Sequence, residues 1–246
     1  MKQMKPTKRW KPEVLTSKAD ASRGADEQIA QLLKLFAQIR QTGRASFLDL
    51  SLGQKQQLAQ YIRLLLEWNQ RINLISPNDE DRIAERHILE SLAVLSVWDF
   101  PNESTVLDLG SGGGFPGIPL KIIRPDLAMT LLESRQKKTL FLNTAVRELK
   151  LENCRVVNAR AEELSGEKYS IVIARAVADL KTLWEWSWPL LISGGVLLAM
   201  KGGELDDELQ ALKKFDSRVE YHVLNYREEW EVEASRRLVV VSREQI

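Results

Sequence analysis

The sequence predicts an α/β protein built on a mostly parallel sheet of seven strands, preceded by a smaller helical unit. Short apolar runs alternate with helical segments between residues 105 and 215, which is typical of a parallel sheet covered by helices on both faces. A glycine-rich stretch directly follows the first of these runs. The chain of 246 residues is long enough for one buried core and a smaller attachment, but not for two large domains.

Seven apolar runs are the predicted strands. Parallel neighbours need a crossover connection, which a helix provides, whereas the last two runs have no helix between them. We therefore expect those two strands to form an antiparallel hairpin at the edge of the sheet. The predicted strands span residues 105–109, 129–132, 155–157, 169–174, 195–200, 219–225 and 238–241, and the predicted helices among them span 119–124, 135–149, 179–191 and 204–215.

Three helices are predicted ahead of the sheet. Apolar residues recur at helical spacing from Asp26, and Gly43 ends this first helix. Ser51, with Gln54 three residues later, forms a capping box at the start of the second helix. A third helix is expected over about residues 80–96. The predicted organisation is a flexible basic arm at residues 1–25, a helical unit at 26–99 that contributes to the substrate cleft, and a sheet domain at 100–246.

The first 24 residues have no apolar periodicity and carry seven basic and two acidic side chains. This pattern is typical of a flexible arm, which is either simply solvated or a docking element for a polyanion. The formal net charge of the whole chain is only +1, so the basic excess is local.

The cysteine count and the hydropathy of the sequence indicate the cellular compartment. With Cys154 as the single cysteine, the chain has no disulfide framework and no cysteine zinc site, and we expect no metal centre. No apolar run approaches the roughly 20 residues needed to span a bilayer. We therefore expect a soluble, cytoplasmic protein that does not contact membranes.

The glycine-rich stretch 110–117 lies between a predicted strand and a predicted helix, where α/β sheets bind ligands. Residues 112–117 satisfy the dinucleotide pattern G-x-G-x-x-G, which is weak evidence by itself. A more specific pattern is Asp108 followed by alternating glycines, including Gly110 and Gly112, with Glu133 at the end of the second strand. A carboxylate there can accept hydrogen bonds from two ribose hydroxyls, which indicates an adenosine cofactor.

The end of the sheet distinguishes between the adenosine cofactors. Dinucleotide-binding folds continue with a second mononucleotide-binding half, whereas this chain ends in a predicted hairpin. That architecture is the Rossmann-like fold of class I S-adenosylmethionine-dependent methyltransferases. The alternative, an NAD-dependent oxidoreductase, predicts NAD binding and is disfavoured by the hairpin.

Several sequence blocks together resemble the RsmG (GidB) family, the bacterial 16S ribosomal RNA guanine-N7 methyltransferases. The resemblance covers about residues 50 to 242 and leaves out the basic arm. In this family's pattern Glu133 is often aspartate, which keeps the carboxylate. The blocks are DLGSGGGFPGIP at 108–119, Trp68-Asn69, Asn73-Leu74, RHILES at 86–91, Arg124-Pro125, LLES at 131–134, Lys137-Lys138, Phe141-Leu142, Ala161-Glu162, Arg175-Ala176 and LAMKG at 198–202.

The resemblance implies an activity and partners. The chain would transfer a methyl group from S-adenosyl-L-methionine to N7 of a guanine in 16S ribosomal RNA, nucleotide 527 in conventional rRNA numbering. Its partner would be the RNA or the small ribosomal subunit, and we expect a monomer. A non-catalytic RNA-binding factor on the same fold is the alternative, and methyl transfer to ribosomal RNA distinguishes the two.

The family's cofactor contacts fall on five residues of this chain, which are Gly110, Phe115, Ala161, Glu162 and Arg175. Asp108, Gly112 and Glu133 complete the expected cofactor site from the residue pattern itself. Arg175 and Lys201 end the fourth and fifth predicted strands, so both cations are expected to project into the ligand crevice, where they suit a phosphate or a carboxylate.

No catalytic acid or base is predicted. Cys154 begins a strand and is not placed as a nucleophile, and residues 174–177 lack the Pro-Pro block that exocyclic-amine methyltransferases use. Guanine N7 fits these absences because its lone pair carries no proton, so orientation supplies most of the catalysis. The candidates for substrate positioning are Arg86, His87 and Lys201. For His87, a structural role in a hydrogen bond is an equal alternative.

Two further groups have open roles. Arg135, Lys137 and Lys138 open a helix beside Glu133 and either hold RNA phosphates or form a solvated face. Trp184 and Trp188 lie four residues apart, and packing against the sheet is favoured over base stacking.

Overall fold

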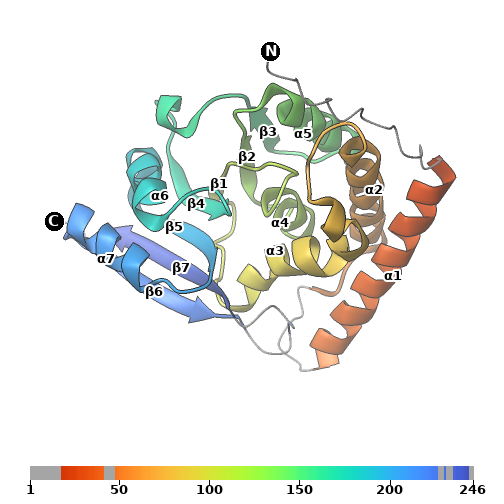
Figure 1. The fold of residues 1–246 in the computed structure, drawn as a ribbon, viewed down its shortest axis with the longest axis horizontal. Coiled ribbons are helices and arrows are strands. Elements are labelled where there is room, and N and C mark those ends of the chain that lie inside the picture. The colour runs from red at the N-terminus through yellow and green to blue at the C-terminus, as the bar shows by residue number, and fades with distance from the viewer. Residues whose placement is uncertain (1–17, 42–47, 227–229, 231–234, 244–246) are drawn as a thin grey trace, which may run out of the picture.

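A seven-stranded sheet forms the centre of the molecule, as predicted (Figure 1). The computed structural model describes residues 18–41, 48–226, 230 and 235–243. The strand order is β3-β2-β1-β4-β5-β7-β6. The strands are β1 (Thr105–Leu109), β2 (Ala128–Leu132), β3 (Cys154–Val157), β4 (Tyr169–Arg175), β5 (Leu191–Gly202), β6 (Val219–Asn225) and β7 (Arg236–Arg243).

The first five strands are parallel and the last two are not. β1 pairs in parallel with β2 and β4. The carboxyl ends of these three strands therefore lie side by side, at Leu109, Leu132 and Ala174. β7 runs antiparallel between β5 and β6, so the predicted hairpin is confirmed and its second strand is the inner one. The order reverses at β1, where the chain turns from β2 and β3 to β4 on the other side, and ligands of such sheets bind at this point.

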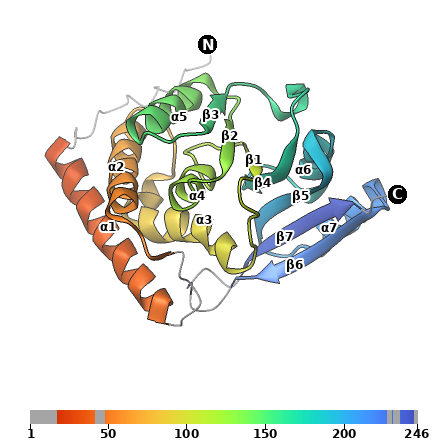
Figure 2. The same ribbon diagram turned by 180° about the vertical axis from the view of Figure 1, so that it is seen from behind.

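Helices cover both faces of the sheet because alternate strand residues on each face are apolar. Ile171 and Ile173 of β4 belong to one core, and Val172 and Ala174 belong to the other. The first core is covered by α4 (Gly117–Ile123), α5 (Gln136–Glu148) and the N-terminal helices, and the second by α6 (Leu180–Ser187) and α7 (Asp206–Phe215). Figure 2 shows the hairpin from behind, at the edge of the sheet opposite to α5.

The N-terminal unit begins with α1 (Lys18–Gln41) and α2 (Leu52–Asn69). α1 starts at Lys18 and not at Asp26, so part of the predicted arm is helical, and residues 1–17 lie outside the described part of the chain. The predicted capping box is confirmed, since the Ser51 side chain accepts a hydrogen bond from the Gln54 amide and the Gln54 side chain accepts one from the Ser51 amide.

The expected single helix over residues 80–96 is wrong in detail. The segment divides into a 3-10 turn (Pro77–Arg82), a π-helical turn (Ala84–Leu89), the short α3 (Glu90–Ala93) and a second 3-10 turn (Val94–Ser96). Apolar periodicity gives the buried face of such a segment but not its winding. Wide π turns occur frequently at functional sites, and this one carries two of the predicted positioning residues, Arg86 and His87.

One apolar core connects the N-terminal unit to the sheet. It contains Leu32 and Leu58 from the first two helices, Leu92 from α3, and Leu131 and Ile173 from the sheet, all of them 0% exposed. The buried Trp230 belongs to the same core. The N-terminal helices therefore share one buried core with the sheet domain. Among the described residues, no helix is long and apolar enough to cross a membrane.

Candidate cofactor and substrate site

The glycine loop connects β1 to α4 at the carboxyl edge of the sheet. Gly110, Gly112 and Gly114 have φ values of +75°, +56° and +96°, a region that residues with a Cβ rarely adopt. Gly110 and Ser111 donate their amide hydrogens to the Leu132 carbonyl of β2, both at 2.9 Å. The loop is thereby held close to the end of the neighbouring strand.

Asp108 lies beneath this loop and is completely buried. Its Oδ2 atom accepts a hydrogen bond from the Gly117 amide at 3.0 Å, at the first residue of α4. Its Oδ1 atom has no hydrogen-bond partner among the described residues. Desolvation raises the pKa of Asp108 to about 7, because burial penalises the charged form more than the hydrogen bond from the Gly117 amide favours it. Asp108 therefore supports the loop from below.

Glu133 directly follows β2 and faces the glycine loop. One carboxylate oxygen accepts a hydrogen bond from the Gly112 amide at 3.0 Å, and the other accepts one from the Arg135 amide at 2.7 Å. Each oxygen keeps a further lone pair for another donor. Asn158, after β3, donates to the Glu133 carbonyl at 2.8 Å and fixes the backbone there. The carboxylate is thus held in one position and can still accept two hydroxyl hydrogen bonds.

Ala161 and Glu162 lie in a 3-10 turn (Ala161–Glu163) that follows β3. The Glu162 side chain is exposed. Because β3 neighbours β2, this turn lies along the same carboxyl edge as Glu133. The structure thus places these two predicted residues at the same edge as the glycine loop.

Arg175 ends β4 and reaches the glycine loop from the other side. Its guanidinium lies 5.3 Å from the centre of the Phe115 ring, in a cation–π contact. It also contacts Oε2 of Glu90 at 3.3 Å and donates to the Arg86 carbonyl at 3.2 Å. Glu90 makes a second ion pair, with Arg236 of β7 at 3.4 Å. Arg175 therefore joins the glycine loop to the N-terminal unit.

His87 is buried and stacks on Phe115, with ring centres 4.9 Å apart. Its Nδ1 atom faces a guanidinium nitrogen of Arg175, and because arginine can only donate, Nδ1 accepts and Nε2 carries the hydrogen. Desolvation, with the nearby Arg175 charge, lowers the pKa of His87 to about 4. Asp79, which pairs with Arg86, lies 3.7 Å from Nε2. His87 is therefore neutral near pH 7 and packs against Phe115, while its buried Nε2 has no hydrogen-bond partner among the described residues.

Tyr61 is a site residue that the sequence did not reveal. Its hydroxyl donates to the Gly113 carbonyl at 2.6 Å, and its ring lies 5.5 Å from that of Phe115. In the sequence, Tyr61 is one apolar position in the stripe of α2, which gives no sign of this contact. α2 therefore supports the glycine loop directly.

Arg175 and Lys201 do not share a crevice, contrary to expectation. Arg175 pairs with Met200 in the sheet register, so the next residue, Lys201, projects from the opposite face. Lys201 contacts Glu208 of α7 at 2.7 Å and donates to the Ala178 carbonyl at 3.0 Å. The two strand ends do lie together, but alternation of side chains separates the two cations.

A groove of about 480 Å³ opens beside His87 and Arg175. Ala176 and Arg236 from the sheet side line it together with residues of the π turn, and its size suits a small ligand or a nucleotide. Its charged side chains are paired with one another, as in Arg86 with Asp79 at 2.9 Å. The lining residues are Leu35, Asp79, Arg82, Glu85, Arg86, His87, Leu89, Glu90, Arg175, Ala176 and Arg236.

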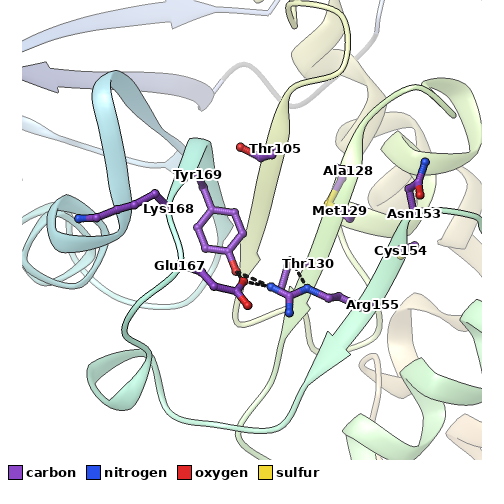
Figure 3. A pocket seen from close by; sticks show the side chains of 10 residues that line it. All are labelled: Thr105, Ala128, Met129, Thr130, Asn153, Cys154, Arg155, Glu167, Lys168 and Tyr169. Carbon is purple, nitrogen blue, oxygen red and sulfur yellow. Dashed lines mark hydrogen bonds and ion pairs between the residues drawn. The ribbon is translucent and has the colours of Figure 1, made fainter.

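A second cavity, of about 500 Å³, lies at the opposite, amino edge of the sheet (Figure 3). Its charged groups also bind one another, since Arg155 contacts Glu167 and donates to the Tyr169 hydroxyl at 3.2 Å. Cys154 also lines this cavity, and burial raises the pKa of its thiol to about 12. Ligands of parallel sheets bind at the carboxyl edge, so this cavity is not part of the site.

The remaining candidates from the sequence are Lys138 and the two tryptophans, Trp184 and Trp188. Lys138 is half-buried beside the loop, with Nζ 3.9 Å from the position that a Cβ on Gly112 would take. Trp184 is buried, and its ring lies 5.3 Å from that of Trp188, which is 38% exposed. Both tryptophans belong to the α6 side of the sheet, away from the glycine loop, and Arg243 lies 4.4 Å over Trp188.

The fold and the loop together define a class of protein. The sheet is parallel with a terminal antiparallel hairpin, a glycine loop with positive φ values follows β1, and an acidic residue follows β2. These features are those of a class I S-adenosylmethionine-dependent methyltransferase. The fit to this cofactor is supported by the fixed Glu133 carboxylate, whose free lone pairs face the loop.

Comparison with known proteins gives the family. Residues 54–236 match the family described as GidB, rRNA small subunit methyltransferase G. The Ribosomal RNA small subunit methyltransferase G of Roseiflexus castenholzii is 47% identical over 168 residues, which are 66% of this chain and 71% of that protein. The protein of the same name from Salinibacter ruber is 42% identical over 190 residues, 73% of this chain and 87% of that protein. The chain therefore belongs to the rRNA small subunit methyltransferase G family.

The fold is also shared with more distant methyltransferases. The glycopeptide N-methyltransferase MtfA, solved with S-adenosyl-L-methionine, has a TM-score of 0.54 and 12% sequence identity. The match covers 63% of this chain and 94% of that one. The family match and this shared fold together confirm the predictions of fold class, methyltransferase class and cofactor.

Replacing Gly110 with alanine should weaken cofactor binding by about tenfold, which corresponds to about 1.4 kcal/mol. A Cβ there would lie 2.8 Å from a methyl carbon of Val177, so the glycine loop, which would bind the cofactor, must itself shift. Gly166→Ala is the matched control, because Gly166 also has a positive φ, +86°, and nothing lies within 4 Å of its added Cβ. Isothermal titration with S-adenosylmethionine should show the loss for Gly110→Ala alone. Equal affinities of the two variants would contradict the assigned position of the site.

Proposed function

We propose that this chain transfers the methyl group of S-adenosylmethionine to N7 of one guanine in 16S ribosomal RNA, at nucleotide 527 in conventional rRNA numbering. The observation that carries the proposal is the groove beside Phe115, where arginines gather and pair with the carboxylates of Asp79, Glu85 and Glu90 that line it. The imidazole of His87 has Nδ1 engaged by Arg175. A nucleophile without a proton fits such a site.

The cofactor supplies a methyl group activated by a positively charged sulfur. The chain's own residues would hold and orient the cofactor. Glu133 would bind the ribose hydroxyls, and the glycine backbone would pass beneath the methionine part. Ala161 and Glu162 would lie beside the adenine, and Arg175 with Phe115 would close the site toward the groove. Guanine N7 has an in-plane lone pair, so holding it about 3 to 3.5 Å from the methyl carbon supplies most of the rate.

RNA would approach the site along exposed cations. Arg135 and Lys137 are exposed at the start of α5 beside Glu133, and Arg82, Arg86 and Arg236 line the groove, where each is paired with a carboxylate. Such side chains neutralise phosphates, which makes affinity strongly dependent on salt. The protein would act on the RNA or the small subunit in the cytoplasm, as a monomer.

The test combines the purified chain with S-adenosylmethionine carrying a labelled methyl group and with small subunits or 16S RNA from cells lacking this activity. Nuclease digestion and mass mapping should give 7-methylguanosine at one position only. RNA binding without methyl transfer would indicate the non-catalytic alternative. Binding of NAD, with no transfer, would indicate the oxidoreductase. Label on a base other than guanine, or on an exocyclic amine, would refute the N7 assignment.

A further inference from the structure

The loop at residues 176–179, between β4 and α6, covers the glycine loop. Ala176 has a positive φ of +54° and is exposed, and Val177 is 36% exposed. Val177 lies over Gly110, since a Cβ added there would be 2.8 Å from its Cγ2 atom. Ala176, Val177 and Ala178 have no reactive group, and the Asp179 carboxylate caps α6 by accepting hydrogen bonds from the Thr182 amide and hydroxyl, both at 2.9 Å. What this loop contributes to a reaction therefore depends on where its backbone and Val177 lie.

The end of the loop nearer α6 is held by a pair of charged residues. Lys201 Nζ donates to the Ala178 carbonyl at 3.0 Å and lies 2.7 Å from Oε2 of Glu208. The same Glu208 oxygen accepts the Leu180 amide at 2.8 Å. Both side chains are largely buried, at 13% and 28% exposed. Lys201 and Glu208 thus hold the loop backbone through hydrogen bonds at two points, the Ala178 carbonyl and the Leu180 amide, on either side of Asp179.

The other end of the loop is held independently. Arg175, directly before Ala176, is fixed by the Arg86 carbonyl and the Glu90 carboxylate. These contacts come from the N-terminal unit, on the opposite face of the sheet from Lys201. The short loop is therefore anchored from both faces, and removing one anchor leaves the other in place.

We propose that Lys201 and Glu208 are positioning residues for methyl transfer, acting through the loop at 176–179. By holding Val177 over Gly110 they would fix the apolar side chain that covers the glycine loop, next to the expected place of the methionine part of the cofactor. The inference rests on the proposed function, and it gives Lys201 a role without substrate contact. Misplacing a reacting group by about 1 Å costs about 100-fold in rate, so a loosened loop affects the transfer step more than cofactor binding.

The experiment compares Lys201→Met with Lys213→Met. Lys213 also donates its ammonium group to a backbone carbonyl, that of Val219, but it lies at the far end of α7. We expect Lys201→Met and Glu208→Gln to lower kcat by about 10- to 100-fold. The KM for RNA and the Kd for S-adenosylmethionine should stay within about threefold, and Lys201→Arg should recover most of the rate, because it keeps a charged donor. Lys213→Met should leave kcat unchanged.

A second readout does not require activity. Amide hydrogen exchange at residues 176–180 should accelerate by about tenfold or more in Lys201→Met and not in Lys213→Met, because local opening then costs less. Unchanged exchange, or an unchanged kcat, in Lys201→Met would overturn the proposal. So would losses of kcat that are equal in both lysine variants. If the wild-type chain transfers no methyl group to RNA, the proposed function fails, and exchange still decides whether the pair holds the loop.

Discussion

Replacing Glu90 with alanine is expected to lower the free energy of unfolding by about 3–5 kcal/mol. Its side chain is 12% exposed, and its carboxylate lies between Arg175 at 3.3 Å and Arg236 at 3.4 Å. Removal would leave two guanidinium groups near each other without the buried counter-charge, which is far more costly than losing an exposed pair. Urea unfolding followed by circular dichroism measures the change.

Glu67→Ala is the control for Glu90→Ala. Glu67 also pairs with an arginine, Arg71 at 3.6 Å, but both side chains are well exposed. Such a pair on a helix contributes only about 0.2–0.5 kcal/mol. Methyl transfer should fall with Glu90→Ala, because Arg175 loses the contact that holds it beside Phe115, and should be unchanged with Glu67→Ala. Similar losses of stability in the two variants would show that Glu90 does not neutralise the arginines as the geometry indicates.

Replacing Glu133 with alanine is expected to raise the Kd for S-adenosylmethionine by about 100-fold or more. Hydrogen bonds to a charged group contribute about 1.5–3 kcal/mol each, and the carboxylate has lone pairs for two hydroxyls. The variant also removes the acceptors of the Gly112 and Arg135 amides, so the loop itself loosens. Glu133→Gln, which keeps one acceptor oxygen, should lose less. Isothermal titration measures all three proteins.

Glu167→Ala is the matched control for this second variant. Glu167 is a paired carboxylate too, with Arg155, but it lines the cavity at the amino edge of the sheet. Its removal should change the Kd by less than about twofold, because binding energy comes from contacts at the carboxyl edge. A large effect of Glu167→Ala, with little effect of Glu133→Ala, would move the cofactor to the cavity in Figure 3.

The strands and the glycine loop were predictable because they depend on short-range patterns. Alternating apolar runs, a glycine stretch after a strand and a carboxylate after the next strand are all visible in the chain itself, and the missing helix between the last two runs indicates the hairpin. The capping box at Ser51 is equally local, and the structure has it as predicted.

What the sequence did not reveal depends on contacts between distant elements. Tyr61 reads as one apolar position of a helix, yet it hydrogen-bonds Gly113 across the core. Arg175 and Lys201 both end strands, but a one-residue difference in register sends them to opposite faces. The winding of the Ala84–Leu89 turn is set by its packing, and no spacing of apolar residues distinguishes it from a regular helix.

The shared apolar core limits how this chain can be engineered. Leu58 and Leu92 lie in the same apolar cluster as Leu131 and Ile173. Cutting the chain between the helical unit and the sheet domain would therefore expose a large apolar surface on each fragment. Swapping the helices between relatives as an independent cassette would require redesigning both surfaces together. Changes in RNA preference would therefore arise more readily through substitutions along the groove than by exchange of modules.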